Sequence, residues 1–216
     1  MSFRYGIALI PEPGFTARVY RARQLICGQY ACWAAEMHML RLPLIEYFRC
    51  PEGAVESLSA GLKMLASQAP RKYQEVPLVH HGIATSPECP GDIFLDFTVP
   101  DPEDRQQRRF LTLNPLRTDV MELLRQVYGV NTDNVLSSDE YRPHISLMQH
   151  TELPPTVFES AVSFAGAVIK DLEIPKEIRA WQMVLLRFES DVAGEDWSHG
   201  GWDADLRWNL LASYPI

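Results

Sequence analysis

The stretch that decides the fold covers residues 141–148 and reads Tyr141-Arg142-Pro143-His144-Ile145-Ser146-Leu147-Met148. Its run of apolar residues is typical of a β-strand. Side chains two positions apart on a strand point to the same face, so we expect His144 and Ser146 to stand side by side. A proton-transfer group beside a hydroxyl donor is chemistry suited to a phosphate.

An earlier stretch has the same strand-like character around a single histidine and reads Glu36-Met37-His38-Met39-Leu40-Arg41-Leu42. It lacks the hydroxyl, because Leu40 stands where Ser146 stands in the later stretch. On a regular strand Arg41 points away from His38, so it replaces the missing donor only if a bulge re-aims it. The favoured interpretation of Arg41 is an edge or surface arginine paired to a carboxylate, and contact with a ligand is the alternative.

The composition is that of an ordinary globular protein. The chain has 216 residues, of which 46% are hydrophobic and 22% charged, so it can bury a core as one large or two small domains. No apolar run is long enough to span a membrane, and the N-terminus enters a strand-like pattern directly. We therefore expect a cytoplasmic protein with no membrane partner. Free thiols are favoured for Cys27, Cys32, Cys50 and Cys89, which have no zinc-finger spacing.

The formal charge of −8 argues against a protein that coats long nucleic acid, because neutralising many phosphates requires a broad basic face. A small anionic ligand needs only a local focus of positive charge. We interpret most arginines as solvated surface groups and retain Arg41 and Arg142 as ligand candidates. The arginines interpreted as surface groups are Arg18, Arg21, Arg23, Arg105, Arg108 and Arg109.

Strand and helix patterns alternate along the chain. Strands are predicted over residues 4–10, around His38 to residue 48, and over 77–84, 92–99, 141–148, 181–188 and 207–214. Helices are predicted over residues 17–31, 55–66, 116–129 and 157–169, the second of them from apolar residues at three- and four-residue spacing. Each half of the chain has the order strand, helix, histidine strand, helix, strand. The second half adds a charged insert over residues 101–109 and a terminal strand.

This internal duplication predicts one bilobal domain over residues 1–216, with halves of about 1–90 and 91–216 and with strands that could be exchanged between the lobes. A pseudo-twofold axis between the lobes would bring His38 and His144 together at a central cleft.

The arrangement resembles the two-histidine phosphoesterase superfamily, which includes RNA 2′,3′-cyclic phosphodiesterases and the enzymes once called 2′-5′ RNA ligases. That family is marked by two His-x-Thr/Ser motifs roughly a hundred residues apart, each on a core strand and often preceded by proline. Pro143-His144-Ile145-Ser146-Leu147 matches in full, whereas Met37-His38-Met39-Leu40-Arg41 matches only in its histidine and strand context. We therefore expect an α+β fold of two pseudo-symmetric lobes, each an antiparallel sheet with helices on its outer face.

The resemblance implies a monomeric, metal-independent phosphodiesterase that needs no cofactor and acts on a nucleotide or on the phosphate ester at an RNA end. His38 and His144 would be the acid and base, since imidazole titrates near neutral pH, and Ser146 would donate to phosphate oxygens. The other candidate substrate-binding positions are Arg142, Leu40, Arg41 and Tyr5. A weakened relative that only binds a nucleotide or a protein stays open, because Leu40 cannot donate.

The His80–His81 pair and the loop 191–205 are two further candidates for a functional role. Adjacent strand residues point to opposite faces, so His80 and His81 cannot chelate one metal ion without distortion. The Gly- and Asp-rich loop 191–205, with Trp197 and Trp202, is either a lid over the cleft or an exposed hairpin connection.

Overall fold

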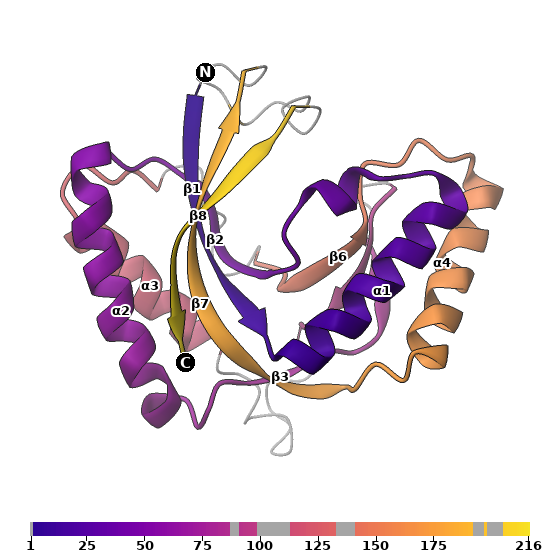
Figure 1. Ribbon diagram of the computed structural model, residues 1–216, viewed down its shortest axis with the longest axis horizontal. Helices are drawn as coiled ribbons and strands as arrows, with labels where there is room; N and C mark the ends of the chain where they lie inside the picture. The colour runs from indigo at the N-terminus through magenta and orange to yellow at the C-terminus, as the bar shows by residue number, and fades with distance from the viewer. Residues whose placement is uncertain (1, 87–90, 99–112, 133–140, 192–196, 198–204) are drawn as a thin grey trace.

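A computed structural model describes residues 2–86, 91–98, 113–132, 141–191, 197 and 205–216. The fold is α+β, with two antiparallel sheets that each carry helices on one side (Figure 1). This confirms the predicted fold class.

The larger sheet has five strands in the order β2-β1-β7-β3, with β8 also paired to β7. The strands are β1 (Ser2–Pro11), β2 (Leu42–Phe48), β3 (Pro77–Val79), β7 (Glu177–Ser190) and β8 (Arg207–Pro215). The two faces of β1 bury different residues, as the two-residue period of a strand requires. Ile7 and Leu9 enter the main core, while Ala8 and Ile10 enter a smaller apolar cluster with Phe188.

The smaller sheet has three strands in the order β4-β5-β6. They are β4 (Ile83–Thr85), β5 (Ile93–Asp96) and β6 (His144–Met148). Ile145 and Leu147 of β6 are fully buried in the main core, so the alternate residues His144 and Ser146 face the other way.

In the described part of the chain, four α-helices cover the sheets. Helices α2 (Val55–Lys72) and α3 (Leu113–Gln126) pack on each other and on the larger sheet, whereas α1 (Pro13–Tyr30) packs on β6 and on α4 (Pro155–Asp171). In Figure 1 the two helix pairs lie on opposite sides of the molecule, with the sheets between them. The chain therefore exchanges elements, because α1 follows β1 of the larger sheet but packs on the smaller one.

Two predicted strands differ from the structure. The strand predicted over 77–84 is divided between the sheets: the His80 N–H donates to Lys176 O (3.0 Å), and the His81 N–H donates to Asp96 O (2.7 Å). Gly82 completes this crossover with φ 105°, a conformation that glycine adopts at little cost. The strand predicted from around His38 to residue 48 is present only from Leu42 onwards, as β2. Its first part is absent, since His38 follows the short 3-10 helix η1 (Ala34–Met37).

Within the described part of the chain, no helix is both long and apolar enough to cross a membrane.

Candidate active site

A small pocket brings the two histidine segments together. Its lining includes His38 and Arg41 from the first segment and His144 and Ser146 from the second. The cavity volume is about 50 Å³. The remaining lining residues are Arg23, Met39, Pro43, Glu46, Tyr47, Gln149 and His150.

His144 is positioned by regular strand geometry. It opens β6 and pairs with Asp96 of β5, while Ser146 pairs with Phe94. The His144 ring lies 4.9 Å from the Phe94 ring, and its Nδ1 is 2.8 Å from Arg142 O. Because a carbonyl oxygen only accepts, Nδ1 carries a proton, which leaves Nε2 as the atom that can exchange a proton with a ligand. The Ser146 hydroxyl has no hydrogen-bond partner among the described residues.

His38 lies in an irregular connection and is 7% exposed. Its backbone is extended (φ −103°, ψ 142°), but it pairs with no strand. Its buried Nδ1 has no hydrogen-bond partner among the described residues, which is rare for a buried polar atom and leaves it available to a ligand. Burial, helped by the positive charge of Arg41, lowers the pKa of His38 to about 4. His38 is therefore uncharged at neutral pH.

Arg41 lines the same pocket as His38, contrary to the regular-strand expectation that the two side chains point apart. Its Nε and Nη2 donate to Glu46 Oε1, and Nη1 donates to Met39 O (3.3 Å). The predicted pairing with a carboxylate is present, but Arg41 is buried and lines the pocket rather than lying at an edge or on the surface. The pKa of Arg41 is raised by Glu46 despite the opposing effect of burial, so its charge is firmly held.

A β-bulge explains how Glu46 reaches the pocket. Tyr5 of β1 pairs with Phe48 and Ile7 pairs with Ile45, so β2 has one additional residue in this interval. Tyr47 has the left-handed φ of 58°, which is uncommon for a residue other than glycine. Both Glu46 and Tyr47 consequently line the pocket, although successive residues of a regular strand would face opposite ways.

The remaining predicted substrate-binding residues do not line this pocket. Leu40, expected at the position of a hydroxyl donor, has its side chain 1% exposed in the main core. Tyr5 is also buried in that core, with its ring 6.0 Å from Phe48. Arg142 is exposed and precedes the first residue of β6, so strand alternation does not direct it to the face of His144. Among the candidate residues, the structure thus brings together His38, His144, Ser146 and Arg41.

The fold has counterparts among solved structures. A structure described as a phosphoesterase superposes with a TM-score of 0.50 at 10% identity, covering 100% of this chain and 99% of that chain. The chain has the fold of a phosphoesterase. This confirms, for the fold, the resemblance drawn from the histidine motifs.

Other structural matches of this phosphoesterase fold are more distant. E. coli LigT complexed with 3'-AMP matches with a TM-score of 0.47 at 11% identity, covering 99% of this chain and 97% of that chain. Kluyveromyces marxianus Usb1 with uridine monophosphate matches with a TM-score of 0.39 at 9% identity over 99% and 97% of the two chains. No protein-family model and no curated protein sequence matches the chain.

Within this phosphoesterase fold, Arg23 is the main site residue that the sequence interpretation missed. The residue type predicts a solvated surface group, whereas Arg23 is 1% exposed. A signal was present, since Arg23 follows the buried Val19 by four residues and precedes the buried Ile26 by three, which places it on the apolar face of α1. Gln149 and His150, which follow β6, carried no comparable signal.

The other weighed features lie away from the pocket or outside the described residues. His80 is buried, its Nδ1 accepts the Gly82 N–H (3.2 Å) and burial lowers its pKa to about 4. No group of three or more His, Cys, Asp or Glu side chains in the described part of the chain could hold a metal ion. Trp197 is buried and its ring stacks on Tyr47 at 5.7 Å, while Trp202 and most of loop 191–205 lie outside the described residues, as do Cys89 and the insert 101–109.

Proposed function

We propose that the protein is a metal-independent phosphodiesterase that hydrolyses a cyclic phosphate, a 2′-5′-linked nucleotide or the phosphate ester at an RNA end. The observation that carries the proposal is the lining of one pocket by His38, His144 and Ser146. A cavity of about 50 Å³ suits a phosphate group rather than a whole nucleotide, whose pockets usually exceed about 300 Å³. The nucleoside would therefore lie at the mouth of the pocket.

The charges around the pocket favour an anion, although the whole chain is acidic. Arg41 shares its charge with Glu46. Arg23 donates only to neutral backbone carbonyls, and no described carboxylate forms an ion pair with it. The pocket thus holds two buried guanidinium groups against one carboxylate, which is a local focus of positive charge.

The two histidines differ in a way that assigns their roles in this proposal. His38 is uncharged at neutral pH because its pKa is about 4, so it acts as the base that accepts a proton from water. His144, with Nδ1 bound to Arg142 O, acts as the acid that protonates the departing ribose oxygen through Nε2. A bound phosphate offsets the positive charges near His38 and raises its pKa, which makes it a better base at neutral pH.

Ser146 supplies the hydroxyl donor for a non-bridging phosphate oxygen. The first segment has no equivalent, because Leu40 is in the core. The loss of one such preorganised donor costs on the order of 10²- to 10³-fold in rate. We therefore expect a slow enzyme.

A second candidate function is binding without turnover, and the burial of Leu40 favours it over a fully active site. Such a protein would hold a nucleotide phosphate between the same residues. It would do so without the second hydroxyl donor in the transition state.

One screen tests both candidates. Purified protein is incubated in EDTA with 2′,3′-cyclic nucleotides, 2′-5′ dinucleotides and RNA ending in a 2′,3′-cyclic phosphate, and binding of the same compounds is measured with His144→Ala. The proposal predicts hydrolysis that persists in EDTA and is lost in His144→Ala. Binding without hydrolysis would support the second candidate, and absence of both would contradict the two proposals together.

A further inference from the structure

Arg23 occupies an unusual position for an arginine. It lies in the middle of α1, and its side chain is 1% exposed. Arginine is almost never fully buried unless it is paired, because taking a charge out of water costs free energy. The groups whose interactions offset this cost therefore indicate the role of Arg23.

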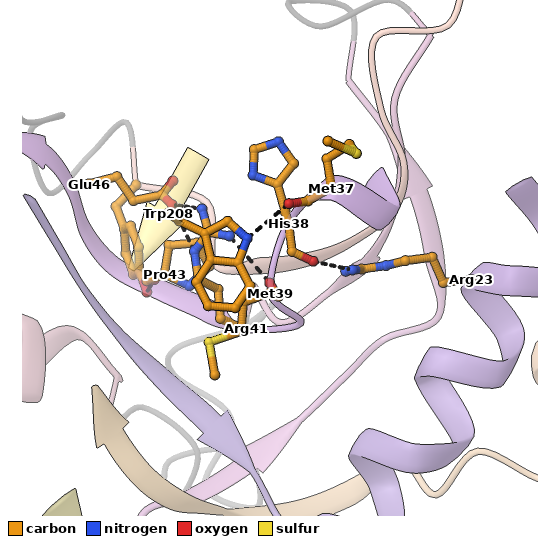
Figure 2. Close-up of polar contacts among 9 residues, drawn as sticks. Arg23, Met37, His38, Met39, Arg41, Pro43, Glu46 and Trp208 are labelled. Carbon is orange, nitrogen blue, oxygen red and sulfur yellow. Dashed lines mark hydrogen bonds and ion pairs between the residues drawn. The ribbon is translucent and has the colours of Figure 1, made fainter. Parts of the chain in front are cut away.

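The guanidinium of Arg23 bonds to both histidine segments. Its Nη1 donates to His38 O (2.9 Å) in the first segment and to Ala35 O (3.0 Å) immediately before that segment. Its Nε (3.1 Å) and Nη2 (2.7 Å) both donate to Ser146 O in the second segment. Figure 2 shows the contact with His38. One rigid planar group thus joins the segment that leads into β2 of the larger sheet to β6 of the smaller sheet.

All four of these bonds go to neutral carbonyl oxygens. The charge of Glu36 acts on Arg23 only at longer range, the Tyr20 ring lies 5.5 Å from the guanidinium carbon, and Arg41 adds a further positive charge. Burial lowers the pKa of Arg23, but a guanidinium retains its charge at neutral pH. No described carboxylate therefore forms an ion pair with Arg23, and the charge of Glu36 offsets the guanidinium charge only in part.

We propose that Arg23 is a positioning residue that fixes the separation of His38 from the His144–Ser146 strand and places a positive charge that is in no ion pair behind the bound phosphate. The expected effect on kcat rests on the proposed function. The claim that Arg23 holds the two segments together depends only on the four hydrogen bonds. Lysine cannot reproduce the arrangement, because one ammonium lacks the planar fork that reaches carbonyls on two segments.

The test compares Arg23→Met and Arg23→Lys with Arg18→Met. Arg18 is the matched control, since it lies on the same helix, is exposed and donates to the carbonyl of Glu173 (2.7 Å) away from the pocket. Three quantities are measured: the pKa of His38 by NMR, the dissociation constant for inorganic phosphate, and kcat and KM for the best substrate in the screen. The pKa of His38 is set first by burial, and the charged groups that act on it besides Arg23 are Arg41, Glu46 and His150. All three residues are retained in these variants.

In Arg23→Met, we expect the pKa of His38 to rise slightly, because burial and Arg41 lower it more than Arg23 does. We also expect phosphate binding to weaken about tenfold and kcat to fall on the order of 10²-fold. In Arg23→Lys, the charge is kept, so the pKa of His38 and phosphate binding stay near those of the parent while kcat still falls. Arg18→Met should match the parent in all three.

Several outcomes would overturn the proposal. A folded Arg23→Met protein with the parent's phosphate affinity and kcat would do so. If Arg23→Met does not fold, Arg23→Lys decides, and a kcat equal to that of the parent would refute the positioning role. If the parent hydrolyses none of the esters, the proposed function fails, while the phosphate affinities of the parent and of Arg23→Met still decide whether Arg23 supplies a positive charge to the pocket.

Discussion

The two histidine segments reach one pocket by different means. His144 stands on β6, where strand pairing and the burial of Ile145 and Leu147 fix its direction. His38 lies between a 3-10 helix and β2 and is held by long-range contacts: the Arg23 bond to its carbonyl and the Trp208 indole, which donates to Met37 O at 2.9 Å. Figure 2 shows these groups around His38. One histidine is therefore positioned by regular strand geometry, whereas the other is positioned by tertiary contacts.

The difference extends to the electrostatics of the rings. His38 is 7% exposed with its pKa lowered to about 4, whereas His144 is half-buried and has a carbonyl partner for Nδ1. The two histidines should therefore not be interchangeable.

The largest expected effect comes from removing either histidine. His38→Ala and His144→Ala should each reduce hydrolysis roughly 10²- to 10⁴-fold, because each removes a proton-transfer group. His81→Ala is the control, since His81 is exposed and does not line the pocket. Measurement of kcat for the three variants checks this, and a parental kcat in His38→Ala would show that the irregular segment has no catalytic part.

Removal of the remaining hydroxyl should have the next largest effect. Ser146→Ala should lower kcat on the order of 10²- to 10³-fold with little change in fold, because its side chain bonds to no described residue. Ser163→Ala, an exposed serine on α4, should leave kcat unchanged. Equal kcat values for Ser146→Ala and Ser163→Ala would show that Ser146 does not contact the phosphate.

The buried histidines should make the fold sensitive to acid. The pKa values of His38 and His80 are lowered from 6.5 to about 4, so between these values the unfolded chain binds more protons than the folded one. The free energy of unfolding should then fall as the pH falls from 6.5 to 4, by about 3 kcal/mol for each histidine.

Denaturant unfolding at several pH values measures this loss. His38→Gln should remove about half of the combined effect of the two histidines, whereas the exposed His81→Gln should not alter it. An unchanged slope in His38→Gln would mean that His38 is not buried in its neutral form.

A smaller effect is expected at Leu40, the position that lacks the hydroxyl. The burial of Leu40 in the core predicts that Leu40→Thr gives no gain in activity and lowers the free energy of unfolding. Leu40→Val is the matched control, because valine and threonine have the same shape. The difference between the two variants is the cost of a buried hydroxyl, roughly 1 to 3 kcal/mol. Faster turnover in Leu40→Thr would place this side chain against the ligand.

Much of the fold could be predicted from local patterns. The apolar spacing of α2 and the apolar run of β6 indicated the correct elements, and the order of strands and helices was largely right. The division at His80 and His81 could not be predicted in this way, because the neighbouring residues read as one continuous strand. Only the hydrogen bonds of these residues to Lys176 and Asp96 show that the chain changes sheets there.

The candidate site was predictable where strand alternation applies. This rule predicted the side-by-side placement of His144 and Ser146, but it failed for Leu40 and Arg41 because their segment is not a strand. Arg23 was missed because arginine is usually exposed. Its residue type predicted exposure, although its position on the apolar face of α1 indicated burial.

The most direct test of the central claim is an NMR titration of the histidine rings with a nucleoside 2′-monophosphate in EDTA. If His38 and His144 share one phosphate site, their ring signals should shift together with a single dissociation constant, while those of His80 and His81 stay in place. Movement of His144 without His38, or movement of the two with different dissociation constants, would contradict the account.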